Sequence, residues 1–135
     1  MLRALDFELV EVERGFAAFH GEPDERFLNP TGMVHGGYAA TLLDSACGIA
    51  AQKLASAGQA FTTLELKVSY HRAISSRTGL VRAEGRVVSP GRRAVFAEAA
   101  LKDAAGRLLA SATSTLLAID TPAHVPADAP FDKES

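Results

Sequence analysis

A single apolar helix constrains the fold of this chain more than any other segment. Between Tyr38 and Gln52 the sequence has no proline, a single glycine and a single charged residue, Asp44. Between Gly36 and Ser56 apolar residues cover most of a helix circumference, and they include Ala39, Ala40, Leu42, Leu43, Ala46, Cys47, Ile49, Ala50, Ala51 and Leu54. A helix that is apolar nearly all round is usually buried. We therefore predict one central helix, from Gly36 to about Ser56, that other elements must enclose.

The rest of the chain supplies strands to enclose this helix. Four strand candidates follow it, at residues 61–71, 79–88, 94–102 and 108–119. Turn-like residues 89–92 and 103–106 separate the last three candidates, and such short connections favour antiparallel neighbours. Before the helix, residues 5–12 and 15–20 predict a hairpin whose first strand slips in register near its end. The sequence thus predicts an α+β fold in which about six antiparallel strands wrap around one long helix.

Composition bounds the domain organisation and the classes of partner. The chain has 135 residues, of which 47% are hydrophobic, enough to bury one core. We expect one domain over residues 1–120 and a flexible, proline-containing tail over residues 121–135. Residues 22–28 fit either a short helix or an irregular loop. A net charge of −2 argues against a nucleic-acid partner, which basic domains bind. Because there is no signal sequence and no apolar run of about 18 residues, we expect a cytoplasmic protein without a membrane partner.

The start of the helix is the first candidate for a functional site. A histidine and two glycines, His35, Gly36 and Gly37, lead directly into it. The first backbone N–H groups of a helix have no partner within the helix and carry partial positive charge, so they suit an anion or a developing oxyanion. A glycine lets a ligand's carbonyl group approach the backbone closely, and either Gly36 or Gly37 meets this requirement.

Asp44 is the second candidate, because it lies inside the otherwise apolar helix. A buried carboxylate costs free energy unless it is paired, hydrogen-bonded or neutralised. The presence of an acid at this position therefore indicates a functional role.

These residues belong to a longer pattern, which consists of Asn29, Gly32, His35, Gly36, Gly37 and Asp44. The pattern resembles the PaaI-type acyl-CoA thioesterases of the hot-dog fold, and the resemblance extends over residues 5–119. It implies an enzyme that hydrolyses aryl-acetyl or medium-chain acyl-CoA thioesters and uses no cofactor, since CoA is part of the substrate. The resemblance also implies that the Gly36 N–H binds the oxyanion and that the Asn29 side chain contacts substrate or water. Asp44 is then the general base or the nucleophile, and His35 orients the loop.

Thr63 is the position at which the resemblance implies a hydroxyl that orients the water or the acid. The strand around it alternates, and its apolar face carries Leu64, Leu66, Val68 and Tyr70. Thr63 falls on the opposite face together with Glu65 and Lys67. A bulge or a strand end is therefore required to bring the Thr63 hydroxyl to the site.

The spacing of Gly36 and Asp44 predicts a homodimer. The two residues lie two turns apart on one helix, roughly 12 Å, which is too far for both to reach one thioester carbon. If both are catalytic, the helix must lie antiparallel to its copy, with Gly36 of one chain facing Asp44 of the other. A two-fold interface makes two such sites at once. This agrees with the dimeric sites of the resembling family, whose dimers often pair into tetramers.

The phosphates of CoA require positively charged partners. Arg92 or Arg93, in the turn at residues 89–93, is the first candidate, and Arg72 is a further one. Gly37 is a further candidate for contact with the bound ligand, because a glycine leaves room for it. Small helix residues leave room for an acyl pocket, and they are Ala46, Gly48, Ala50 and Ala51.

The remaining reactive residue types predict no further site. Cys47 reads as a small core residue, and one cysteine excludes an intrachain disulfide or a multi-cysteine zinc site. The histidines His20, His71 and His124 are scattered without metal-ligand spacing, so we predict no metal.

Two other functions fit the same fold. One is a hot-dog dehydratase or hydratase, although the histidine-and-acid patterns of those enzymes are missing. The other is a non-catalytic acyl- or CoA-binding module.

Overall fold

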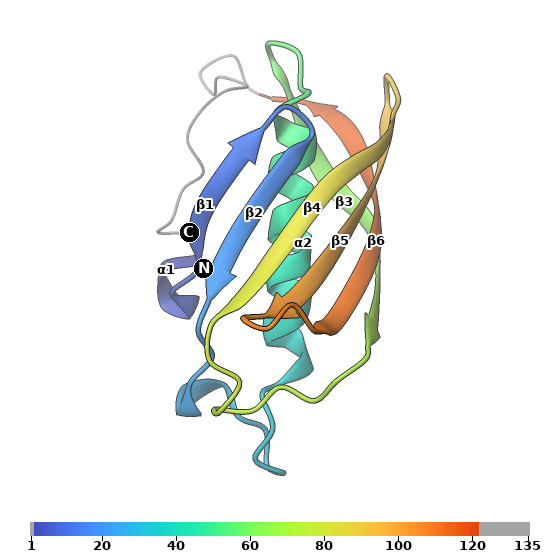
Figure 1. Cartoon of the computed structure of the whole chain (residues 1–135). Coiled ribbons are helices and arrows are strands. Elements are labelled where there is room, and N and C mark those ends of the chain that lie inside the picture. Colours follow the sequence, from blue (N-terminus) through green and yellow to red (C-terminus); the bar gives the residue numbers. More distant parts are fainter. Residues whose placement is uncertain (1, 122–135) are drawn as a thin grey trace.

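Six antiparallel strands form one sheet that curls around a long helix in the computed structural model, which describes residues 2–121 (Figure 1). The strands lie in the order β1-β2-β4-β5-β6-β3, so β1 and β3 are the two edges. Their bounds are β1 Glu8–Glu13, β2 Phe16–Gly21, β3 Gln59–Tyr70, β4 Val81–Pro90, β5 Ala94–Asp103 and β6 Leu108–Asp120. The helices are α1 (Leu2–Leu5), a 3-10 turn η1 (Glu25–Phe27) and the central α2 (Gly36–Gln52). This confirms the predicted arrangement of six strands around one helix.

Several element boundaries differ from the prediction. Helix α2 ends at Gln52 rather than near Ser56, because the chain tightens into a turn in which the Leu54 N–H bonds to the carbonyl of Ala51. At the N-terminus, Asp6 has a φ of 56°, which separates α1 from β1, so the first strand begins at Glu8 rather than Leu5.

Other boundary details match the sequence. The predicted slip in the first strand is present as a register shift between Leu9 and Glu11. The ambiguous stretch at residues 22–28 contains the single 3-10 turn η1. The tail predicted for residues 121–135 lies, from residue 122 on, outside the described residues. Within residues 2–121, no helix is long and apolar enough to cross a membrane.

The sheet lies very close to α2 at Gly85 of β4. A Cβ atom on Gly85 would lie 2.5 Å from the carbonyl carbon of Ala46 and 2.8 Å from the backbone nitrogen of Cys47. Ala46, Ala50 and Ala51 are fully buried. The sheet therefore packs tightly on these three alanines, whereas a Cβ atom on Gly48 would meet nothing within 4 Å, and the acyl pocket expected beside these small residues stays a prediction.

A β-bulge at Leu64 divides β3 into two halves. Thr63 pairs with Leu116 and Glu65 pairs with Thr115, so Leu64 has no partner in β6. The extra residue reverses the alternation of the strand. Thr63 therefore lies on the side of the sheet that faces α2, as Leu66 does, and the prediction that Leu64 shares the inner face is wrong, since its side chain is 67% exposed.

Candidate active site

The loop that precedes α2 is folded by Asn29. Its backbone N–H bonds to the carbonyl of Met33 at 2.6 Å, and its side-chain oxygen accepts hydrogen bonds from the backbone N–H groups of Thr31 (2.9 Å) and Met33 (3.2 Å). The amide nitrogen of Asn29 donates to no acceptor within residues 2–121. Asn29 thus shapes the loop with its oxygen and keeps its NH₂ group for another contact. Its predicted contact with substrate or water stays a prediction.

His35 caps α2 and uses the Gly37 donor in doing so. The backbone N–H of Gly37 donates to Nδ1 of His35 at 3.1 Å. The His35 backbone is itself held, because its N–H bonds to the carbonyl of Phe27 at 2.7 Å. The backbone N–H of Gly36 has no acceptor in the described part of the chain. Of the two glycine N–H groups, only that of Gly36 is therefore without a hydrogen-bond partner in residues 2–121 and able to bind a ligand.

Tyr70, at the end of β3, fixes the other side of the Gly36 backbone. Its hydroxyl donates to the carbonyl oxygen of Gly36 at 2.7 Å. A Cβ atom on Gly36 would lie 3.1 Å from that hydroxyl oxygen, so the position favours a glycine. From the sequence, Tyr70 was expected on the apolar face of its strand but not in the site; its place on that face was the only available signal.

A cavity of about 240 Å³ adjoins the start of α2. Its lining includes His35, Gly36, Tyr70 and Arg72. Apolar side chains complete its wall, and they are Met33, Val34, Ala39 and Ile74. Its position gives an elongated, partly apolar ligand access to the unpaired N–H of Gly36. Asn29 and Asp44 are not among the lining residues.

Asp44 is half-buried on α2 and is paired with Thr63. The Thr63 hydroxyl donates to Oδ1 of Asp44 at 2.8 Å. This contact exists because the bulge at Leu64 turns Thr63 toward the helix. One turn further along α2, a Cβ atom on Gly48 would meet nothing within 4 Å. The acid therefore borders open space on the face of the helix that the sheet leaves uncovered.

Cys47 lies close to Asp44 in sequence but is unsuited to be a nucleophile. Its side chain is fully buried, and burial, followed by the charges of Asp44 and Glu98, raises the pKa of its thiol to about 12. The reactive form of a cysteine is the thiolate. Its interpretation as a core residue agrees with this burial.

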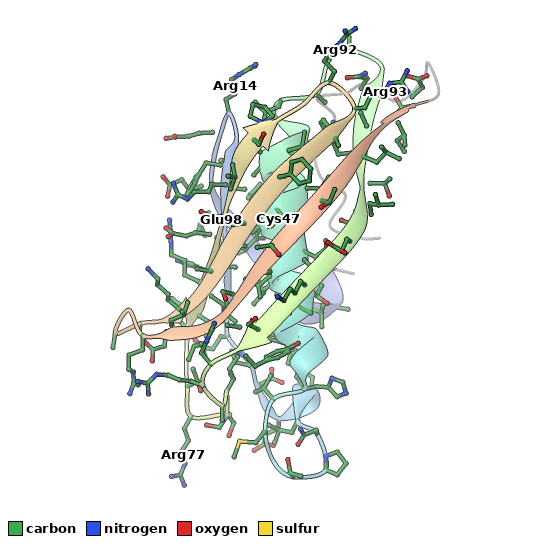
Figure 2. All side chains as sticks on the ribbon, turned by 90° about the vertical axis from the view of Figure 1, so that its right-hand side faces the viewer. Arg14, Cys47, Arg77, Arg92, Arg93 and Glu98 are labelled. Carbon is green, nitrogen blue, oxygen red and sulfur yellow. The ribbon has the colours of Figure 1, made fainter. Side chains whose placement is uncertain are left out.

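The predicted arginines lie at opposite ends of the molecule. Figure 2 shows Arg92 and Arg93 at one end and Arg77 at the other, where α2 begins. Arg72 lines the cavity beside Gly36, whereas Arg92 lines a separate cavity of about 460 Å³. Within one chain, the structure thus brings Gly36 and Arg72 together but leaves Asp44, Arg92 and Arg93 apart from them.

Comparisons with known proteins agree on one class. A family model described as the thioesterase superfamily matches residues 31–110. The proofreading thioesterase EntH of Klebsiella pneumoniae is 31% identical over 107 residues, which cover 79% of this chain and 77% of that protein. The 1,4-dihydroxy-2-naphthoyl-CoA hydrolase of Listeria monocytogenes is 28% identical over 112 residues, which cover 83% of this chain and 89% of that protein. The solved structure of a mutant of the phenylacetic acid degradation protein PaaI from Thermus thermophilus matches with a TM-score of 0.78 and 26% identity, covering 86% of this chain and 96% of that one.

Proposed function

Because this chain belongs to the thioesterase superfamily, we propose that it hydrolyses an aryl-acetyl or medium-chain acyl-CoA thioester at sites shared by two copies of the chain. Membership confirms the hot-dog fold, the resemblance to PaaI-type enzymes and an activity as a thioester hydrolase. It favours neither the dehydratase nor the non-catalytic binding module. The substrate, the oxyanion site and the contribution of a second chain are the parts that we propose.

The observation that carries the proposal is the hydrogen bond between Thr63 and Asp44. It occupies Oδ1 of the carboxylate, while Oδ2 accepts no hydrogen bond from residues 2–121. Open space lies one helical turn away at Gly48. A carboxylate that is oriented through one oxygen and free at the other can take a proton from a water molecule or attack a carbonyl carbon.

The N–H of Gly36 supplies the second requirement of thioester hydrolysis. The thioester carbonyl oxygen accepts a hydrogen bond from it, and this bond strengthens as negative charge develops on that oxygen. Asp44 removes a proton from water, and the water oxygen attacks the carbonyl carbon. The C–S bond then breaks, and the CoA sulfur leaves with the proton that Asp44 returns. In the alternative route Asp44 attacks the carbon itself, the C–S bond breaks and CoA leaves as the thiolate, which takes a proton from solvent; water then hydrolyses the mixed anhydride to the free acid and regenerates Asp44.

One chain does not bring these two groups together. Gly36 and Asp44 lie two turns apart on α2, about 12 Å along the helix, and the cavity beside Gly36 does not include Asp44. A second copy that packs antiparallel on the uncovered face of α2 would place its Gly36 opposite Asp44. We therefore propose a homodimer with two equivalent sites, which can pair further into a tetramer.

The names of the relatives support an acyl group with an aromatic part, and the medium-chain alternative rests on the resemblance alone. One relative hydrolyses a naphthoyl-CoA, and one structural relative is named for the degradation of phenylacetic acid. Assays with phenylacetyl-, benzoyl-, hexanoyl- and octanoyl-CoA, which follow the release of free thiol, test this class. A preference for acetyl-CoA or long-chain acyl-CoA over all four would contradict it.

Mixing two inactive variants tests the shared site. Gly36→Pro removes the N–H donor, and Asp44→Asn removes the base or nucleophile. In a fully exchanged equal mixture, half of the dimers are mixed and each has one intact site, so about one quarter of the wild-type activity should return. A mixture that exchanges subunits, as shown by two different tags, and yet stays inactive would exclude a site built from two chains.

A further inference from the structure

A second cavity, of about 300 Å³, adjoins the cavity at the start of α2 and shares Arg72 and Ala73 with it. Three arginines line it, two from the connection between β3 and β4 and one from the turn between β5 and β6. Arg72 follows β3, Arg77 lies in the loop that leads to β4, and Arg107 lies in the turn between β5 and β6. We call the site that these three side chains form the arginine recess.

The charges of the arginine recess are only partly balanced. The single acid in its lining, Asp103, accepts a hydrogen bond from Nε of Arg107 at 2.7 Å. The side chains of Arg72 and Arg77 make no hydrogen bond or ion pair within residues 2–121. Two guanidinium groups thus remain without a counter-charge beside the proposed thioester site.

Asp103 also gives the recess a fixed wall. Its side chain is buried, and its Oδ1 accepts hydrogen bonds from the backbone N–H groups of Ala105 (3.0 Å) and Arg107 (2.9 Å). The carboxylate is therefore held by the turn and in turn holds the Arg107 guanidinium in place. A guanidinium that is already positioned loses less conformational freedom when it binds an anion.

We infer that the arginine recess binds the phosphates of the nucleotide end of CoA, while the adjoining cavity holds the arm that carries the thioester. This inference rests on the proposed function. Guanidinium groups match phosphate oxygens with paired hydrogen bonds, and the recess adjoins the cavity beside Gly36, with Arg72 and Ala73 lining both. The inference assigns the phosphates to the end of the molecule opposite to Arg92 and Arg93 (Figure 2).

Comparing substrates with and without the nucleotide tests the assignment. The double variant Arg72→Gln/Arg77→Gln should raise KM for an acyl-CoA by about tenfold or more, because it removes two charge-assisted contacts. Because Arg72 also lines the cavity for the arm, a small loss is expected for the same acyl group on pantetheine, which lacks the phosphates, but it should be at least about fivefold smaller than the loss for acyl-CoA. The rise in KM with salt concentration should also be weaker in the variant than in the wild type.

A control separates this effect from a general loss of positive charge. Lys67→Gln/Arg86→Gln removes two cations that line the outer face of the sheet, and it should leave both substrates unaffected. An equal loss for acyl-CoA and the pantetheine thioester in Arg72→Gln/Arg77→Gln would show a structural effect and overturn the assignment. The assignment would also be overturned if Arg92→Gln/Arg93→Gln raised KM for acyl-CoA while the recess variant did not.

Binding of free CoA, measured by calorimetry, makes the result independent of hydrolysis. The wild type should bind CoA at least about tenfold more tightly than Arg72→Gln/Arg77→Gln, and the Lys67→Gln/Arg86→Gln control should match the wild type. If no acyl-CoA is hydrolysed but this difference is found, the proposed function fails and the recess stands. If acyl-CoA is hydrolysed but the affinities are equal, the recess fails alone.

Discussion

Replacing Gly36 by proline removes one hydrogen-bond donor from the start of α2 with little other disturbance. Proline is well tolerated at the first position of a helix, where its fixed φ is suitable and the N–H has no helical partner. The residue before it must be extended, and His35, with ψ of 136°, already is. The Gly36 N–H has no acceptor within residues 2–121, so its removal breaks no internal hydrogen bond.

Both proline and alanine add a Cβ atom at this position, and that atom makes a close contact. It would lie 3.1 Å from the Tyr70 hydroxyl oxygen and 3.2 Å from the ring carbon that bears it, so the Tyr70 side chain must shift slightly. Gly36→Ala makes the same contact but keeps the N–H, which makes it the matched control. The two variants then differ in the N–H donor and in the proline ring atoms Cγ and Cδ, and equal thermal stability of the two shows that the ring atoms do not disturb the fold.

Loss of one oxyanion donor typically lowers the rate by roughly 10²–10³-fold, or about 3–4 kcal/mol of transition-state stabilisation. We expect kcat/KM of Gly36→Pro to be lower than that of Gly36→Ala by this factor. The assay follows free thiol from an acyl-CoA, with thermal unfolding as a check that both variants fold equally well. Values of kcat/KM within about threefold of each other would refute the assignment of Gly36 as the oxyanion donor.

Three further predictions concern residues that support the site. Thr63→Val should lower kcat roughly tenfold or more with little change in KM, because it removes the hydrogen bond that orients Asp44. Thr63→Ser keeps the hydroxyl and should retain most of the wild-type kcat. Full activity in the valine variant would contradict this role. Gly85→Ala should lower the free energy of unfolding by about 1–3 kcal/mol, because the added methyl group would overlap the backbone of α2. An unchanged thermal midpoint would contradict the close packing. The backbone N–H of Arg107, together with its guanidinium, lowers the pKa of Asp103 below its ordinary value of 3.8. The stability that this contributes is present above about pH 4 and is lost as the pH falls through the lowered pKa. The difference in thermal midpoint between the wild type and Asp103→Asn should therefore shrink from pH 6 to pH 3. A difference that stays constant over this range would contradict the prediction.

The central helix and most strands were predictable because their signals are local. An apolar run with one charged residue, Asp44, indicates a buried helix regardless of what surrounds it. In strands with alternating side chains, such as β5, the spacing of the apolar residues alone predicts which face is buried. The start of the site was local as well, since His35, Gly36 and Gly37 are consecutive.

The features that could not be predicted from the sequence depend on contacts between segments that are distant in the chain. The bulge at Leu64 is defined by the ladder with β6, and alternation within β3 alone gives the wrong face for Thr63. The need for Gly85 arises only where β4 crosses Ala46. The arginine recess gathers residues from two separate connections, the one between β3 and β4 and the one between β5 and β6, and the sequence singled out only Arg72. Each of these requires the fold before it can be seen.

The bulge in β3 also determines how this chain must be compared with shorter or longer relatives. Because Thr63 and Glu65 pair with the neighbouring residues Leu116 and Thr115, deleting Leu64 would leave every other partner in the ladder unchanged. A relative that lacks one residue here can keep its hydroxyl beside the helix acid, although its numbering shifts by one. The corresponding hydroxyl is therefore identified by the residue opposite it in β6 and not by counting along the strand.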